Sequence, residues 1–287
     1  MSASLLREPE VLRDIALGDA PACMALSQSV GWPHRVEDWE MAIGLGGGIV
    51  ISLGSEIVAT ASWWPYGETH ATLGLIVVSP QHQGAGLGRR LMQGLLARTH
   101  GRSLLLNATV AGTPLYERSG FVAWGGRIRQ HHGTALGVAA PLAAEGAVLR
   151  SAQACDLPLL ERLDEAATGL PRGALLRAVM ERGEGVVLER SGKAAGFSML
   201  RRFGRGFVIG PVVAADDADA RVLVAHWLQA RQGEFLRIDL PADSALSDWL
   251  VSCGLKAVDC VTSMVRGTLP LARGPVQLHA PASQAFG

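Results

Sequence analysis

Apolar residues recur along this chain with the two periods that distinguish helices from strands. In the first half, alternating or continuous apolar runs predict strands at 11–15, 49–53, 57–64, 70–78, 104–107 and 121–128. Helical spacing predicts helices at 19–30, 37–45 and 114–118, and one that follows the glycine-rich turn and runs to about 99; Asp19 and Pro21 suit the start of the first one. The strand 70–78 is almost continuously apolar, which is typical of a central position in a sheet.

The same order of elements starts again near residue 147. Val148-Leu-Arg150 resembles Val11-Leu-Arg13, and Gly254-Leu255 resembles Gly120-Phe121. The pattern predicts strands at 148–150, 186–190, 194–201, 206–213, 235–240 and 255–266, and helices at 156–167, 171–182, 216–232 and 244–253. Gly, Ala and Pro dominate the stretch between the copies. The sequence therefore predicts two repeated domains, 1–132 and 147–268, a linker at 133–146 and a tail at 269–287.

A glycine-rich turn joins the strand 70–78 to the helix that follows. Gly84, Gly86 and Gly88 let the backbone N–H groups from about Gln83 to Arg89 point at one spot. The helix start adds unpaired donors and the positive end of its dipole, so the turn favours a phosphate. The turn does not end in Gly-Lys-Ser/Thr, which argues against a nucleoside-triphosphate loop. Its glycines also lack the Gly-x-Gly-x-x-Gly spacing of a dinucleotide-binding fold. An ordinary strand-to-helix turn is the alternative.

Two motifs together resemble the GCN5-related N-acetyltransferase (GNAT) family over about residues 10 to 130. Gln83, Gly86 and Gly88 fill Gln-x-x-Gly-x-Gly, and Leu106–Phe121 carries Leu-Tyr-Glu followed by Gly-Phe. The resemblance implies an α/β (α+β) fold of two tandem domains, each with a mixed, mostly antiparallel sheet flanked by helices. It also implies acetyl-coenzyme A (acetyl-CoA) as cofactor. The cofactor contacts that it implies are Ile76, Val77, Val78, Gln83, Gly84, Ala85, Gly86, Leu87, Gly88, Arg89, Asn107, Thr109 and Tyr116.

The resemblance also implies roles in the transfer itself. The backbone N–H of Val78 matches the donor that stabilises the developing oxyanion. Tyr116 matches the tyrosine that protonates the departing thiolate, against the alternative of a half-buried core tyrosine. The family often has Asn where Thr109 stands, while Asn107 lies two residues earlier, so either side chain is a candidate contact of the cofactor arm.

An alkylammonium acceptor must lose a proton before it attacks, because its pKa is about 10. Glu68 and His70, at the start of the strand 70–78, are candidates for that base, acting through water; a solvated turn is the alternative for Glu68. Four ring-bearing side chains are candidates for an acceptor wall that suits a cationic or aromatic amine, although each tryptophan also suits the core. These four residues are Trp32, His34, Trp63 and Trp64.

The second copy departs from the family pattern at its helix start. Ala-Ala-Asp-Asp-Ala-Asp, residues 214–219, replaces the glycine turn, and Trp249 falls near the position of Tyr116. Carboxylates at a helix N-terminus satisfy its donors and repel a pyrophosphate. We expect this copy not to bind the cofactor, and to act either as a cap over the first copy's cleft or as a structural filler.

Charge and cysteine content narrow the class of partner. Lys plus Arg and Asp plus Glu both number 26, so the net charge is zero, and no run of like charge occurs. We therefore expect no nucleic-acid or membrane partner. The N-terminal sequence has no signal-peptide core, which predicts a cytoplasmic protein. The four cysteines lack metal-ligand spacing, and the adjacent His131 and His132 would point to opposite faces of a strand, so no metal site is expected.

These patterns predict an N-acetyltransferase that moves the acetyl group of acetyl-CoA to a primary amine of a small molecule by direct attack in a ternary complex. A CoA-binding sensor or scaffold without turnover is one alternative, and a protein N-terminal or lysine acetyltransferase is another. The acceptor, longer acyl donors and the choice between monomer and homodimer stay open.

Overall fold

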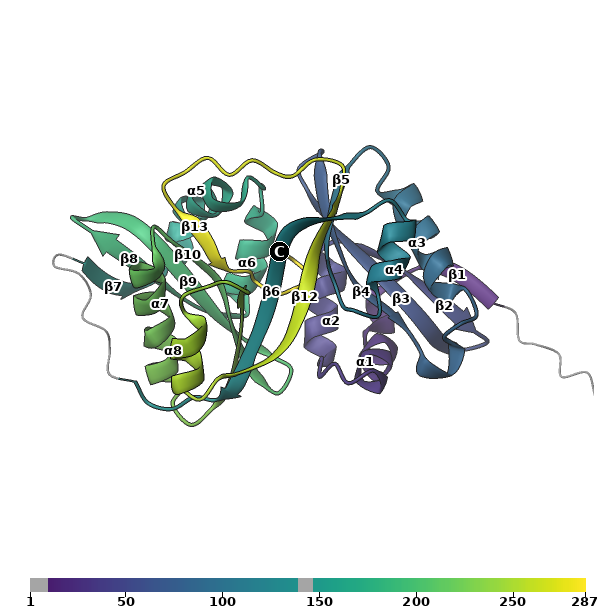
Figure 1. Cartoon of the computed structure of the whole chain (residues 1–287), viewed down its shortest axis with the longest axis horizontal. Coiled ribbons are helices and arrows are strands. Elements are labelled where there is room, and N and C mark those ends of the chain that lie inside the picture. Colours follow the sequence, from purple (N-terminus) through teal and green to yellow (C-terminus); the bar gives the residue numbers. More distant parts are fainter. Residues whose placement is uncertain (1–9, 139–146) are drawn as a thin grey trace, which may run out of the picture. The chain divides into compact units, whose positions relative to one another are not determined.

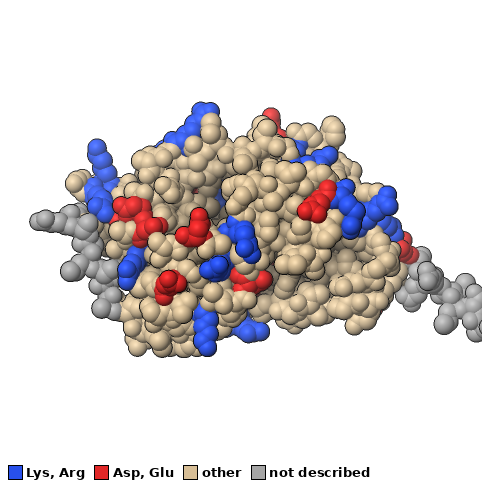
Figure 2. All heavy atoms as spheres, viewed as in Figure 1, with Lys and Arg blue, Asp and Glu red and all other residues tan. Residues whose placement is uncertain are grey.

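The structure is a computed structural model, and it describes residues 10–138 and 147–287. Its contacts divide the chain into two compact units. The first unit is the chain up to Trp64 together with Leu73–His100, and the second is Pro65–Thr72 together with the chain from Gly101 onward. Residues 139–146 of the predicted linker lie outside the described residues. On the face drawn in Figure 2, acidic and basic side chains lie interspersed.

The first unit is built on antiparallel strands, with β1 paired to β2 and β2 to β3. The boundary between the units crosses two strands: β3 ends in the second unit, and β4 begins there. Ile49, Val58 and Leu95 are fully buried and contribute to its core. The elements are β1 (Glu10–Asp14), α1 (Ala20–Ser29), α2 (Val36–Leu45), β2 (Gly47–Leu53), β3 (Glu56–Tyr66), β4 (His70–Val78) and α3 (Leu87–Arg98).

The second unit holds the rest of the described chain. Trp227, Phe121 and Phe197 are among its largest buried side chains, and α7 packs on β9 and β10. Its elements are β5 (Ser103–Ala108), α4 (Thr113–Arg118), β6 (Val122–Thr134), β7 (Ala147–Ser151), α5 (Leu157–Thr168), α6 (Gly173–Glu181), β8 (Gly183–Arg190), β9 (Lys193–Phe203), β10 (Gly206–Ala214), α7 (Asp217–Ala230), β11 (Phe235–Pro241), α8 (Ser247–Ser252), β12 (Lys256–Arg266) and β13 (Gln277–Ala280).

The two repeats exchange their last strands within the second unit. Strand β6 ends the first repeat, yet it lies between β11 and β12 of the second. Strand β12 ends the second repeat, yet it lies between β5 and β6 of the first. The two long strands run side by side (Figure 1). Each repeat therefore completes its sheet with a strand from the other.

The repeat is also visible in one ion pair. Arg13 donates to the carboxylate of Asp19, six residues later, and Arg150 donates to Asp156 in the same way, with distances of 2.7 and 2.8 Å in both pairs. Each aspartate also accepts a backbone N–H three residues before it. Asp19 therefore closes a turn before α1 and does not cap that helix, contrary to the sequence prediction.

Most predicted elements are present within one to three residues of their expected bounds. The tail 269–287, for which no strand was predicted, contains β13, which pairs with β10. The first residues of the predicted linker belong to the sheet, because β6 extends to Thr134 and Ala135 N–H donates to Glu234 O. No helix in the described ranges is long and apolar enough to cross a membrane.

Candidate active site

Two glycines determine the shape of the turn between β4 and α3. Gly84 has a φ of +80°, and Gly86, the residue before α3, has a φ of +84°. A non-glycine residue in this region costs about 1–2 kcal/mol. A Cβ built on either glycine meets nothing within 4 Å, so the space beside the turn is open. Gly88 lies inside the first turn of α3, which corrects the expectation that three glycines form the curl.

The start of α3 supplies donors for an anion. The N–H groups of Leu87, Gly88 and Arg89 have no acceptor within the helix, whereas Arg90 N–H donates to Gly86 O at 3.2 Å. The first turn contains no acidic residue. Arg89 is exposed and forms no ion pair with any described residue, while Arg90 pairs with Glu10. Backbone donors, the helix dipole and one guanidinium together suit a pyrophosphate.

Strand β4 is held at its exit by three hydrogen bonds within the first unit. Leu75 has a φ of +51°, and its carbonyl accepts from the hydroxyl of Thr60 at 2.9 Å. Ser79 N–H donates to Val58 O at 2.8 Å, and Gln83 Nε2 donates to Val78 O at 3.3 Å. The bond to Val78 links the strand end to the turn. Contact of Ile76, Val77 and Val78 with the cofactor stays a prediction, as does contact of Ala85.

Tyr116 lies in α4 of the second unit. Its ring stands edge-on to Phe121 with centroids 6.2 Å apart, and it packs on Gly112, where a Cβ would lie 2.9 Å from a ring carbon. Burial raises the pKa of Tyr116 to about 12. Its hydroxyl forms no hydrogen bond with any residue in the described part of the chain. A protonated hydroxyl without a partner can donate a hydrogen bond to a thiolate. Because a thiol has a pKa of about 8.5, below that of Tyr116, the sulfur can leave as a thiolate stabilised by this bond.

The structure separates the two candidate contacts of the cofactor arm. Asn107 uses both ends of its amide: Nδ2 donates to Gln284 O and Oδ1 accepts from Ser263 Oγ, each at 2.8 Å. Thr109 Oγ1 accepts from Gly112 N–H at 3.2 Å, which leaves its O–H as a donor. Thr109 is therefore the better candidate, and Asn107 joins β5 to β12 and to the C-terminal segment.

The two candidate bases lie at the start of β4. Glu68 is exposed in the turn before the strand. His70 Nδ1 lies 2.9 Å from Thr69 Oγ1, and Nε2 lies 3.2 Å from Thr268 O, so the carbonyl requires the proton on Nε2. His70 begins β4 and Val78 ends it. The role of Glu68 or His70 as a base that acts through water stays a prediction.

The segment between α1 and α2 carries two of the predicted acceptor contacts. Trp32 and His34 are half-buried, and their rings meet edge-on with centroids 5.9 Å apart. His34 also meets Trp39 edge-on at 6.1 Å. The indole N–H of Trp39 donates to Ser27 Oγ, so that ring is fixed in the unit. Binding of an acceptor by Trp32 and His34 stays a prediction.

The other two predicted acceptor contacts lie on β3. Trp64 is 1% exposed, and its indole N–H donates to Ala42 O at 2.8 Å. Trp63 is half-buried and packs over Gly47, where a Cβ would lie 2.1 Å from its ring. Trp64 is therefore a core residue of the first unit, which argues against its place in the aromatic wall. Trp63 stays a predicted contact.

In the second repeat, carboxylates take the place of the glycine turn. Asp216 caps α7 by accepting Asp219 N–H at 2.9 Å, and the buried Asp219 pairs with Arg190. Trp249, near the position of Tyr116, lies under the guanidinium of Arg221 at 4.8 Å. The acidic cap expected from the sequence is confirmed. That this repeat binds no cofactor stays a prediction.

Comparison with known proteins finds acetyltransferase domains in both halves of the chain. An acetyltransferase (GNAT) domain matches residues 46–123, and another matches residues 160–278. The uncharacterized N-acetyltransferase YitH of Bacillus subtilis is 26% identical over 272 residues, which cover 92% of this chain and 94% of YitH. The first domain match falls within the first sequence repeat, and the second covers most of the second repeat and extends into the tail, to residue 278.

Solved structures show the same fold at low sequence identity. A putative acetyltransferase from Pyrococcus horikoshii superposes with a TM-score of 0.78 at 19% identity, over 100% of this chain and 99% of that one. A tandem GNAT protein from the clavulanic acid biosynthesis pathway superposes with a TM-score of 0.66 at 14% identity, over 91% and 99%. The chain therefore belongs to the GCN5-related N-acetyltransferase family, carries two of its domains in tandem, and is an acetyl-CoA-dependent acetyltransferase.

Proposed function

We propose that this chain transfers the acetyl group of acetyl-CoA to a primary amine of a small molecule, by direct attack in a ternary complex. The turn before α3 is the observation that supports it most. Gly84 and Gly86 have positive φ angles in open space, and the helix start offers unpaired N–H groups with no acidic residue in its first turn. The second repeat carries a carboxylate cap at the same place. We therefore propose one cofactor site, in the first repeat.

Each residue of the first repeat then has a role that its chemistry suits. Acetyl-CoA supplies an activated acyl group as a thioester. The amides from Gln83 to Arg89 bind its pyrophosphate, with the Arg89 side chain as a counter-charge. The Val78 N–H stabilises negative charge on the acyl oxygen. The Tyr116 O–H, protonated at neutral pH, donates to the departing sulfur.

The proposal of a small amine acceptor rests on the chemistry of the transfer and on the similarity to a protein of known pathway. An alkylammonium loses its proton to water or to a water chain before attack, because its pKa is about 10. The half-buried rings of Trp32 and His34 suit an amine that carries positive charge or an aromatic group. The tandem protein of the clavulanic acid pathway, a route to a small molecule, shares this fold. It supports a small acceptor over a protein.

Calorimetric titration with acetyl-CoA tests the proposal. Wild type should bind one equivalent, and Gly86→Glu should not bind, because the side chain and its charge block the turn. Gly101→Glu is the matched control: Gly101 has a φ of +83° and equally open surroundings, so it carries the same backbone strain outside the turn. This control should bind as wild type does.

The outcomes separate the alternatives. Failure of wild type to bind would overturn the cofactor site. Binding with no thiol release in the presence of a panel of small amines would overturn the small-molecule acceptor. The same assay with peptides would then distinguish a protein acetyltransferase from a CoA-binding sensor.

A further inference from the structure

Strand β10 has two different partners in succession along one edge. β9 pairs with β10 along the other edge. On the shared edge, β11 pairs in parallel with Phe207–Ile209, and β13 pairs antiparallel with Val212–Ala214. β13 therefore takes over the edge of β10 at the point where β11 leaves it.

This edge is the second repeat's counterpart of the exit of β4. β4 pairs in parallel with β5 over His70–Thr72 and leads into residues 79–86, here called the phosphate turn because we propose that it binds phosphate. β10 pairs with β11 over three residues and leads into α7. Ligands of open α/β sheets lie in the crevice at the carboxyl ends of the parallel strands. In the second repeat, β13 lies in that place.

The segment Val276–Gly287, here called the C-terminal strap, is packed tightly against the sheet. Ala280 and Ala282 are fully buried, and Val276 is 5% exposed. Pro281 O approaches Gly210 so closely that a Cβ there would lie 2.1 Å from it. Only glycine, which has no Cβ, allows the backbone to approach so closely. Gly210 therefore allows the strap to pack directly on β10.

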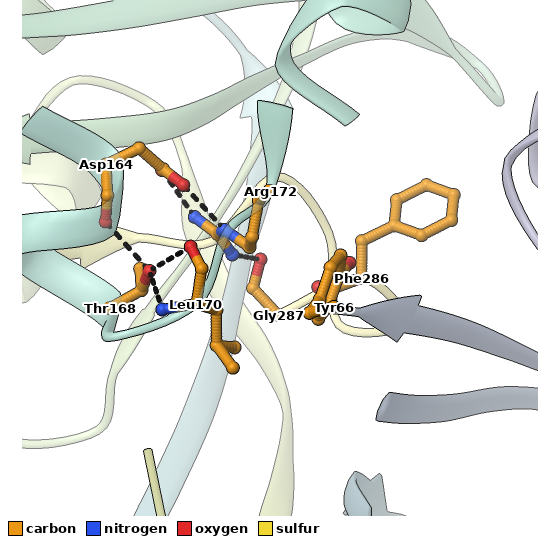
Figure 3. Close-up of polar contacts among 7 residues, drawn as sticks. All are labelled: Tyr66, Asp164, Thr168, Leu170, Arg172, Phe286 and Gly287. Atoms are coloured by element: carbon orange, nitrogen blue, oxygen red, sulfur yellow. Dashed lines mark hydrogen bonds and ion pairs between the residues drawn. The ribbon is translucent and has the colours of Figure 1, made fainter. Parts of the chain in front are cut away.

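The last residues of the strap are held by buried polar groups (Figure 3). Arg172 forms a two-pronged ion pair with Asp164 at 2.7 and 2.8 Å, and both side chains are 1% exposed. The remaining guanidinium nitrogen of Arg172 donates to Gly287 O. Tyr66 O–H donates to Phe286 O at 2.6 Å. A buried arginine and a buried tyrosine thus donate hydrogen bonds to backbone carbonyls of the strap.

The strap also reaches the first repeat. Tyr66 belongs to β3, and Asn107 of β5 donates to Gln284 O. Asn107 lies two residues before Thr109, which begins the turn into α4, the helix of Tyr116. A segment that fills the second repeat therefore also fixes the end of a first-repeat strand.

We propose that the C-terminal strap is a built-in occupant of the second repeat's ligand crevice. It replaces a ligand there, together with the carboxylate cap of α7, and it holds β5 of the first repeat in place through Asn107. The second repeat is thereby a support for the first and not a second catalytic centre. The placement of the strap does not depend on the proposed acceptor, but the count of one cofactor per chain rests on the proposed function.

Hydrogen exchange on the full chain tests this directly. At acetyl-CoA concentrations 100 times the Kd, exchange at 83–90 should slow by up to about 100-fold, while exchange at 277–280 stays unchanged. Faster exchange of β13 would show that acetyl-CoA displaces the strap, and slower exchange would show that it binds over the strap; either result overturns the proposal. Unchanged exchange at 83–90 would instead contradict the proposed function.

Two variants in β13 test the support of β5. Ala280→Asp places a charge at a fully buried site, so exchange should quicken in the strap and also at 103–108 in β5. Gln277→Asp, at an exposed position of the same strand, is the matched control and should exchange as wild type does. Faster exchange of the strap with no change in β5 would overturn the support of β5.

Discussion

Tyr116, the proposed acid, is a buried tyrosine in α4. Its hydroxyl has no partner in the described residues, so its loss leaves no orphaned polar group. Tyr116→Phe should therefore lower kcat by about 100-fold or more, with the Kd for acetyl-CoA and the thermal midpoint nearly unchanged. Steady-state kinetics and calorimetry on the same preparation measure both. An unchanged kcat would remove Tyr116 from the role of acid.

The pKa of Tyr116 also predicts the pH dependence of the reaction. Burial raises this pKa to about 12, so the acid form persists well above neutral pH. A free tyrosine ionises near pH 10, so the burial favours the folded state below that pH and the contribution is lost as the pH rises through about 12. The rate kcat/KM should rise toward pH 10 as the amine loses its proton, with no descending limb below it. A descending limb near pH 8.5 in a kcat/KM profile would indicate a different acid.

A buried ion pair links α5 to the start of α6, between Asp164 and Arg172. Arg172→Met would leave the carboxylate uncompensated, with a loss of about 3–5 kcal/mol in the free energy of unfolding. Arg172→Lys is the conservative comparison, and it should recover only part, because an ammonium cannot make the two-pronged contact. Urea denaturation measures all three proteins. Equal stability of Arg172→Met and wild type would contradict this account.

Elements were predictable because their signals are local. The apolar run 70–78 and the turn after it can be identified from neighbouring residues, and α3 forms where its spacing predicts. β13 has only four residues, and its alternation of polar and apolar side chains is too short to stand out. Its stability comes from β10, more than 60 residues earlier in the chain, and no local pattern reports such a pairing.

In the candidate site too, features set by neighbouring residues were predictable, and features set by distant residues were not. The conformation of the glycine turn before α3 was predictable, because positive φ angles favour glycine at Gly84 and Gly86. The roles of Asn107 and Trp64 were not, because they depend on partners distant in sequence: Gln284 and Ser263 for the amide, and Ala42 for the indole. Both side chains suit a ligand by type, and only their hydrogen bonds show that they are already engaged.

At the scale of the whole molecule, the exchange of closing strands makes each repeat depend on the other. β12 lies between β5 and β6, so the first repeat without the second would leave both strands with an open edge. Unpaired edges are a template for aggregation. The two copies of the domain are therefore not two independent folding units, although each carries the family's order of elements.

Splitting the chain between the repeats tests this dependence. Fragments 1–146 and 147–287, expressed separately, should each aggregate or lack a cooperative thermal transition, because β6 and β12 lose each other. Expressed together, they should co-purify and bind acetyl-CoA with nearly the wild-type Kd, because β6 and β12 can then pair again. An intact chain carrying a protease site within 139–146, cut after folding, is the control for the break itself. A soluble fragment 1–146 that binds acetyl-CoA as a monomer would show that the first repeat closes its sheet without β12, and the exchanged strands would then be dispensable for the site.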